Sequence, residues 1–221
     1  MMEALAALPW AEIGEASLDT LLMLAISMLF TLALGLPLGV VLFLTGKRQL
    51  LAHALLHNVL SFVVNVLRSA PFIILLIVMM PLTKLIAGAS IGVRGTIPPL
   101  VVAAVPFFAR LVETALREVD RGVIEATQAM GASTRQIVLS ALIPEALPGI
   151  VAGLTVTAIA LVSCTAMSGV VGGGGLGDLA IRYGYYRYET DVMIVTVVLL
   201  LLLVQILQIL GDKLVLYCSH R

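Results

Sequence analysis

Residues Asp120–Pro144, with the sequence DRGVIEATQAMGASTRQIVLSALIP, decide the fold because they are neither apolar enough to span a membrane nor polar enough to be a loose linker. Asp120 is a good helix N-cap, and helix-favouring residues follow it. Gly131 suits the left-handed position that ends a helix, and Ser133 and Gln136 have the spacing of a capping box. We therefore predict two short helices that meet at a glycine elbow, the second of which ends at Pro144.

The composition is that of a membrane protein with several spans. Of 221 residues, 61% are hydrophobic and 12% are charged, whereas a soluble domain is about half apolar and a quarter charged. Basic and acidic residues both number 13, so the net charge predicts no nucleic-acid partner. Cys164 and Cys218 are too few for a disulfide framework or a zinc site, and we expect free thiols.

Five segments are long and apolar enough to cross a bilayer, which takes about 20 residues. The third is the weakest, because it contains three prolines and ends with Arg110 and Glu113, which are three residues apart and can pair. We expect that span to be bent, with its charged end in water. The predicted spans are residues 18–45, 57–82, 96–116, 148–167 and 192–210.

These spans define an all-α membrane protein. Its transmembrane domain covers residues 18–212, with the elbow at residues 120–144 between the third and fourth spans. Residues 1–17 contain no Lys or Arg and therefore lack the basic leader of a signal peptide. We expect them to form an external N-terminal segment, and residues 213–221 to form a cytoplasmic tail.

The orientation follows from the basic residues between the spans, which are more frequent on the cytoplasmic side. One side carries four of them and the other side eight, which predicts an external N-terminus, a cytoplasmic C-terminus and a cytoplasmic elbow. The four are Lys84, Arg94, Arg182 and Arg187; the eight are Lys47, Arg48, Arg110, Arg117, Arg121, Arg135, Lys213 and Arg221.

Two features inside the predicted spans have alternative interpretations. Arg68 lies deep in the second span, where a charge needs protein or water beside it. It either binds carbonyl groups freed by Pro71 or lines a polar path. The fourth span has a stripe of small residues, which either packs against another helix or lines a conduit or dimer axis. The stripe consists of Gly149, Gly153, Thr157, Ala160, Cys164 and Ser168.

Met167 ends the fourth span as a flexible apolar side chain among small residues, and we predict that it is a hydrophobic gate. The candidate path residues are therefore Arg68, Ser163, Cys164, Met167 and Ser168. No catalytic or metal-binding combination is found. The glycines of residues 172–175 lack the Lys and Ser/Thr of a P-loop and predict a flexible outer turn.

The elbow contains a recognisable motif. Glu125-Ala126-Thr127, Gly131 six residues after the glutamate, and Pro144 thirteen residues later resemble the EAA signature of permeases of type I bacterial ABC importers. The signature reads E-A-A, three residues, G, nine residues, I-x-L-P. Thr127 replaces its second Ala, while Ala141 and Ile143 replace its Ile and Leu, which weakens the match without changing the spacing.

Further segments resemble the D/L-methionine importer permeases within that group. They are Arg68–Phe72 (RSAPF), Pro106–Arg110 (PFFAR), Pro144–Gly149 (PEALPG) and the stretch from the glycine run to Tyr188. Together they extend the resemblance over nearly the whole chain.

The resemblance implies a transport subunit in the bacterial inner membrane and no enzyme activity of its own. It implies two copies of this chain, two ATPases that bind ATP and Mg, and an external substrate-binding lipoprotein, with no cofactor in this chain. It assigns coupling to the ATPase to Glu125, Ala126, Gly131, Ser133 and Pro144.

The substrate rests on the resemblance alone, because nothing in the composition or spacing selects methionine. A permease for another amino acid or for glycine betaine is the alternative within the same class. A membrane scaffold without transport function is the alternative from another class.

Overall fold

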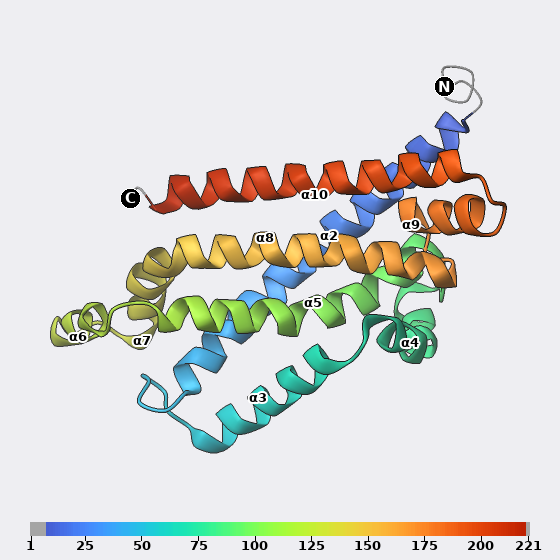
Figure 1. Cartoon of the computed structure of the whole chain (residues 1–221). Coiled ribbons are helices and arrows are strands. Elements are labelled where there is room, and N and C mark those ends of the chain that lie inside the picture. The colour runs from blue at the N-terminus through green and yellow to red at the C-terminus, as the bar shows by residue number, and fades with distance from the viewer. Residues whose placement is uncertain (1–7, 220–221) are drawn as a thin grey trace. The chain divides into compact units, whose positions relative to one another are not determined.

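The computed structural model describes residues 8–219, which form α-helices with no β-strand among them (Figure 1). The α-helices are α2 (Trp10–Thr45), α3 (Ala54–Ser69), α4 (Phe72–Ala87), α5 (Gly92–Arg117), α6 (Arg121–Ala129), α7 (Thr134–Ile137), α8 (Ile143–Ser168), α9 (Gly175–Leu179) and α10 (Thr190–Ser219). Between them lie two π-helical segments, η1 (Val138–Leu142) and η3 (Ala180–Tyr185), and one 3₁₀ turn, η2 (Gly169–Val171).

The number of membrane spans agrees with the prediction in its coarse form. Four helical stretches of the described chain are long and apolar enough to cross a membrane, namely α2, α5, Thr134–Val171 and α10. The pair α3 and α4 makes a fifth candidate if it counts as one broken span.

The second predicted span is not one continuous helix. Helix α3 ends at Ser69 and α4 begins at Phe72, so the helix breaks within residues 57–82. Pro71 explains the break, because it has no N–H to donate and disfavours helical geometry at the residue before it. Pro71 stands just before α4, with φ −59° and ψ 129°. By contrast, the three prolines of the third span lie within α5, which is continuous.

The first and last helices are longer than their apolar segments. Helix α2 begins at Trp10 and not at Leu18, and α10 continues beyond Leu210 to Ser219. The apolar pattern predicts the part of a helix that fits in the bilayer, whereas the helix itself continues until a residue breaks it. Residues predicted as an external segment and a tail are therefore partly helical; residues 1–7 and 220–221 lie outside the described range.

The chain packs as two compact units, and the long helices contribute to both. Unit 1 contains the described residues up to Phe30 together with Ala70–Ala104 and Ala158–Gln208. Unit 2 contains Thr31–Ser69, Val105–Thr157 and the described residues from Ile209 onward.

In unit 2, α5 contacts both α2 and α8 at glycines. A Cβ on Gly39 of α2 would lie 2.6 Å from the Ala109 carbonyl oxygen and 2.6 Å from the Val112 Cβ. On α8, a Cβ on Gly149 would lie 2.9 Å from the Cβ of Ala115. Small residues at these points allow helix backbones to approach closely. The core of unit 2 forms around α5, with Phe108, Val112 and Leu116 almost fully buried.

In unit 1, the glycine run after α8 is a turn, as predicted, with positive φ at Gly172, Gly174 and Gly175, and part of it packs closely against its neighbours. A Cβ on Gly173 would overlap Ser168 Oγ, and one on Gly175 would lie 2.6 Å from Thr20 Oγ1. The Leu176 N–H donates to Thr20 Oγ1 at 2.9 Å, which fixes the start of α9 against α2. The sequence indicated glycine's freedom at turns, which three of these glycines use, but it gave no sign of the close contacts that Gly173 and Gly175 make.

An aromatic and charged cluster follows in the same unit. The Tyr183 hydroxyl donates to both Glu12 carboxylate oxygens, at 2.8 and 2.7 Å, and the Arg187 guanidinium lies 4.4 Å from the Tyr183 ring centre. The hydrogen bond to Glu12 raises the pKa of the Tyr183 phenol, because it stabilises the protonated form. These contacts fasten the loop before α10 to the first turn of α2.

The glycine contacts of α5 can be tested on α2 itself. Gly39→Ala is expected to lower the free energy of unfolding by about 1–3 kcal/mol, since the added methyl overlaps α5. Gly14→Ala is the matched control: Gly14 is also on α2, but a Cβ there meets nothing within 4 Å. That change should stabilise the helix by up to about 1 kcal/mol. Thermal unfolding of both purified variants in one detergent measures the difference, and equal midpoints would refute the close contact.

Candidate functional site

The first half of the elbow, residues Asp120–Pro144, folds as predicted. The Asp120 carboxylate accepts a hydrogen bond from the Gly122 N–H at 2.6 Å and caps the start of α6. The helix ends at Ala129, and Gly131 takes a φ of +80°. That left-handed conformation is easy for glycine and strained for residues with a Cβ, so Gly131 sets the turn between α6 and α7.

The second half of the elbow begins as predicted but does not end as predicted. Gln136 Oε1 accepts from the Ser133 N–H at 2.9 Å, and Ser133 with Gln136 forms the expected capping box at α7. The helix does not give way at Pro144. Instead α7 runs through η1 into α8, and the Ile143 N–H bonds to the Val138 carbonyl in the wide π-helical pattern.

The π-helical turn accounts for this difference. Proline removes one donor from a helix, and a local change from α to π hydrogen bonding is a known way to accommodate a disrupted ladder. Pro144 stands at the second position of α8, directly after the π segment. The second half of the elbow is thereby the start of a 38-residue helical stretch, Thr134–Val171, which is a candidate span.

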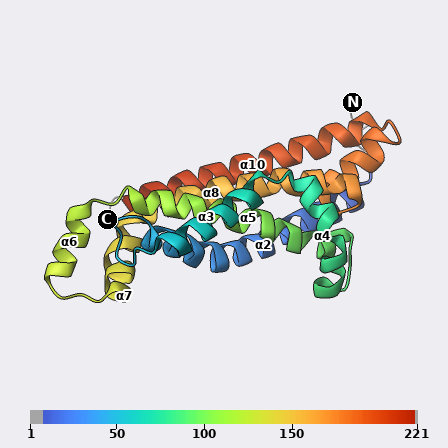
Figure 2. The same cartoon turned by 90° about the horizontal axis from the view of Figure 1, so that it is seen from below.

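The inner face of the elbow is anchored in the core of unit 2. Ile137 and Val138 are buried there with Phe43 of α2 and Leu116 of α5, and Ile124 packs against the same cluster. This anchoring holds α6 and α7 beside the C-terminal end of α5 and the start of α8, where Figure 2 shows them.

The outer face of α6 is open, and this helix contains no buried residue. Glu125, Ala126 and Gln128 are exposed, and Met130, just after the helix, is 77% exposed. The surface therefore combines one carboxylate, one amide and one large apolar side chain on a fixed scaffold. Such a set suits contact with another protein more than chemistry on a small molecule.

A cavity of about 260 Å³ lies between α6 and the loop that connects α2 to α3. Its polar lining includes Glu125 and Gln128 of α6 together with Arg121 and the loop residue Arg48. Glu125 thus shares a small basic cavity with two guanidinium groups. Glu125 lies in the second turn of α6, where the stabilisation of a carboxylate by the helix dipole is already small.

The loop residues of this cavity were not predicted as part of the site. Arg48 has a φ of +64°, which is strained for a residue with a side chain, and its carbonyl oxygen lies 3.5 Å from an Arg121 nitrogen. In the sequence, Lys47 and Arg48 indicated only the orientation of the chain. The proximity of Arg48 to α6 depends on tertiary packing and left no local signal.

A buried carboxylate lies near the end of α5. Glu113 is 1% exposed and pairs with Arg110 at 2.6 Å, as predicted, and also with Arg117 at 2.5 Å. Arg110 in turn donates to the Asn65 amide oxygen of α3 at 2.8 Å. The expectation that this end of the span projects into water is wrong for Glu113, because the two arginines allow the carboxylate to be buried.

The path candidates fall in different environments. In unit 2, Arg68 is exposed and its guanidinium lies 5.8 Å from the centre of the Phe107 ring. In unit 1, Ser163 and Met167 are exposed and lie one turn apart on α8. Figure 1 shows α8, the helix that carries them, as a continuous helix.

The other two candidates on α8 face protein. Cys164 is half-buried. Ser168 is buried, donates its hydroxyl to the Thr165 carbonyl at 2.7 Å, and packs closely against Gly173. The N-terminal part of the small-residue stripe, Gly149 and Gly153, contacts α5. This contact favours the helix-packing interpretation for that part of the stripe.

His53 and His57 also have structural contacts. His53 Nδ1 accepts from the Leu56 N–H at 3.1 Å, and His57 Nδ1 lies 3.1 Å from the Leu42 carbonyl oxygen. Within residues 8–219, no group of three His, Cys, Asp or Glu side chains is placed to hold a metal ion.

Comparison with known proteins gives a consistent result. The model of the family "Binding-protein-dependent transport system inner membrane component" matches residues 35–216. The probable D-methionine transport system permease protein MetI of Vibrio cholerae is 52% identical over 93% of this chain and 92% of its own length. The methionine import system permease protein MetP of Bacillus subtilis is 47% identical over 77% of each chain.

Solved structures agree with these relatives. An inward-facing conformation of the MetNI methionine ABC transporter contains a chain that is 46% identical to this one. It matches with a TM-score of 0.93 over 95% of this chain and 97% of that chain. An amino acid ABC transporter solved with histidines shares the fold, with a TM-score of 0.75 at 16% identity.

The buried carboxylate of α5 gives a stability prediction. Glu113→Gln is expected to lower the free energy of unfolding by about 1.5–3 kcal/mol, since two guanidinium groups lose their charged partner. The loss stays below that of a fully buried pair because Arg117 is 56% exposed. Glu118→Gln, at an exposed acid five residues away, should change stability by less than about 0.5 kcal/mol. Thermal unfolding in detergent compares the two, and similar midpoints would contradict a structural role for the Glu113 network.

Proposed function

The chain belongs to the family of binding-protein-dependent transport system inner membrane components, and on that premise we propose that it is the permease subunit of an ATP-driven methionine importer. Its similarity to methionine permeases over nearly its whole length carries this assignment. It is a multi-pass protein of the bacterial inner membrane and contains the spans through which the substrate passes. The energy comes from ATP hydrolysis in a separate chain.

The elbow and the C-terminus lie on the cytoplasmic side in this proposal, and the N-terminus lies outside. The distribution of basic residues supports the orientation. Unit 2 holds the basic residues of the side predicted to be cytoplasmic, including Lys47, Arg48, Arg121 and Lys213. Unit 1 holds Lys84, Arg94, Arg182 and Arg187 of the opposite side.

The outer face of α6 docks on the ATPase in the proposed assembly of two copies of this chain with two ATPases. Support comes from the match of Glu125, Ala126, Gly131 and Pro144 to the EAA signature and from the exposure of α6. ATP and Mg bind to the ATPase and not to this chain. An external substrate-binding lipoprotein delivers the substrate.

Coupling then follows from the construction of the elbow. Caps and the turn at Gly131 fix α6 relative to α7, and α7 continues through η1 into α8. A displacement of α6 by the ATPase therefore moves the start of α8 and does not bend a loose linker. Alternating access requires such movement of one group of helices against another.

The substrate path contains no catalytic group in this proposal, since the chain moves methionine without changing a bond. The exposed pair Ser163 and Met167 on α8 is the best candidate for a lining position and a hydrophobic gate. Arg68, exposed beside Phe107, is a second candidate. Cys164 and Ser168 are weaker candidates because they are half-buried and buried.

The coupling role gives a prediction for Glu125. Glu125→Lys reverses the charge of the exposed face of α6 and should lower ATP-driven methionine uptake about 10-fold, which is equivalent to about 1.4 kcal/mol of lost interaction. Uptake into proteoliposomes, ATP hydrolysis and co-purification of the ATPase are measured together. The variant should insert normally, because Glu125 is exposed and does not belong to the inner face of α6 that packs against the core.

Glu118→Lys serves as the control, because it makes the same charge change at an exposed acid outside α6. Its uptake should stay near that of the wild type. Normal coupled uptake by Glu125→Lys would eliminate the proposed docking role of this face.

The substrate is tested by competition. The reconstituted importer with its binding protein should take up labelled methionine, and an excess of unlabelled methionine should abolish the signal. An equal excess of glycine betaine or of an unrelated amino acid should leave at least about half of it. Uptake that either of those compounds suppresses as fully as methionine would assign the chain to another solute within the same class.

A further inference from the structure

Unit 2 contains another cavity, of about 350 Å³, where α2 ends, α3 begins and α5 ends. Its polar lining consists of Lys47, Gln49, His57, Asn58 and Arg117, and no acidic side chain lines it. We propose that this cavity binds a phosphate group, either that of an anionic phospholipid headgroup or free phosphate. The proposal is separate from the transport function, and it concerns a different surface from the outer face of α6.

The charge of the cavity fits an anion. Glu113 is one carboxylate shared by Arg110 and Arg117, so this group of three side chains keeps one positive charge. Lys47 adds a second. Arg117 uses one terminal nitrogen for Glu113 and has further N–H groups, and its side chain is 56% exposed. A guanidinium held in place in this way is well suited to the oxygens of a phosphate.

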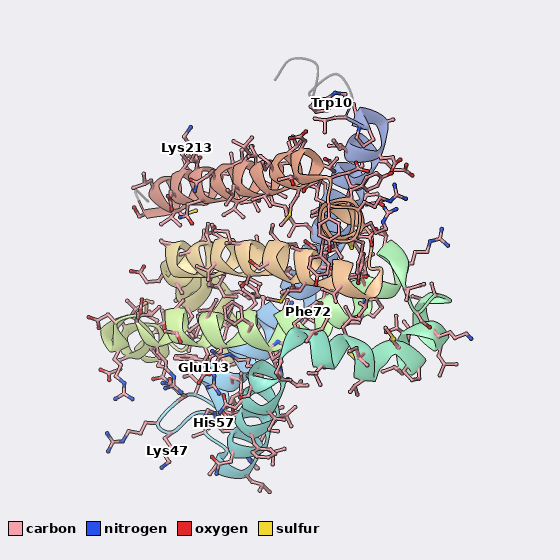
Figure 3. All side chains as sticks on the ribbon, turned by 45° about the vertical axis from the view of Figure 1, so that its right-hand side comes forward. Trp10, Lys47, His57, Phe72, Glu113 and Lys213 are labelled. Atoms are coloured by element: carbon pink, nitrogen blue, oxygen red, sulfur yellow. The ribbon has the colours of Figure 1, made fainter. Side chains whose placement is uncertain are left out.

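Asn58 adds a neutral donor to the lining, whereas His57 shapes the lining and has its one N–H occupied. Carbonyl oxygens only accept, so the His57 Nδ1 that lies 3.1 Å from the Leu42 carbonyl is the protonated nitrogen, which orients the ring. Asn58 follows on α3 with an exposed amide. Figure 3 shows His57 between Glu113 and Lys47, while Lys213 lies far from them in the same unit.

The position of the cavity favours a lipid as the source of the phosphate. Lys47 comes two residues after the end of α2, and Arg117 ends α5; both helices are candidate membrane spans. The cavity is therefore at the level where a span leaves the bilayer and headgroups begin. Basic pockets between spans at this depth are typical sites for anionic headgroups.

The adjoining surface of α3 fits lipid chains. Only Val64 of this helix is buried, while Leu55 is 70% exposed, Val59 52% and Phe62 69%. A phospholipid whose phosphate occupies the cavity can lay its acyl chains along these side chains. Free phosphate shares the polar contacts but gains nothing from the apolar surface, which is the basis for distinguishing the two.

The test uses the purified full-length chain in a neutral detergent. Dioctanoyl phosphatidylglycerol, dioctanoyl phosphatidylcholine and inorganic phosphate are titrated separately, with binding measured by thermophoresis. Lys47→Gln should weaken phosphatidylglycerol binding about fivefold, the effect of one basic residue at an anionic headgroup. Lys213→Gln, an exposed lysine of the same unit away from the cavity, should leave binding unchanged.

A second variant tests the cavity by adding a negative charge and not by removing a positive one. Asn58→Asp places a carboxylate in the cavity at an exposed position and should weaken binding of the phosphate probe at least as much as Lys47→Gln. Saturable binding of phosphatidylglycerol with this dependence, stronger than that of inorganic phosphate, supports a lipid site. Equal binding of both probes with the same dependence supports a site for free phosphate.

The proposal is overturned by any of three results. The first is that neither phosphatidylglycerol nor inorganic phosphate binds saturably to the wild type. The second is that Lys47→Gln and Lys213→Gln weaken binding equally. The third is that the two lipids bind equally and neither Lys47→Gln nor Asn58→Asp changes that binding.

Discussion

The close approach of α5 to its neighbours is the constraint on which unit 2 depends. Gly39 on α2 and Gly149 on α8 leave no room for a side chain where these helices meet α5. In a bilayer the lipid is as apolar as the helix surface, so contact between backbones supplies much of the association. Helix α5 also carries the Glu113 network near its C-terminal end. The elbow packs against the last buried turn of α5, through Ile137 and Val138.

Local signals predicted most of the elbow. Caps at Asp120 and Ser133 and a left-handed glycine at position 131 act over three or four residues, so the sequence alone identifies them. The EAA-like spacing also predicted the family, because a signature spread over twenty residues retains its geometry when Thr127 replaces alanine. Functional class and elbow structure were therefore accessible without coordinates.

Features set by tertiary packing were not accessible. Pro144 was predicted to end a helix. The π-helical segment η1, through which the helix continues past Pro144, has no sequence signal of its own. Arg48 was used only to predict the orientation of the chain in the membrane, yet its loop lines the cavity that contains Glu125. Glu113 was predicted to lie in water; its second partner Arg117 is four residues away on the same helix and could have been identified by spacing, whereas the burial itself depends on packing. The misplaced role of Arg48 is the clearest case, because its partners on α6 are distant in the sequence.

The energetics of α6 explain why its surface suits a partner. A helix of nine residues with no buried side chain is not stable on its own. It persists because Asp120 caps its start, Gly131 fixes its end, and the flanking Val119 and Ile137 are buried in the core. Stability therefore comes from the ends and from Val123 and Ile124 on the inner face, which pack against the core, and the exposed face is free of any packing role within this chain. If α6 docks on the ATPase as proposed, substitutions on its exposed face change the docking contacts and leave its connection through α7 to α8 unchanged.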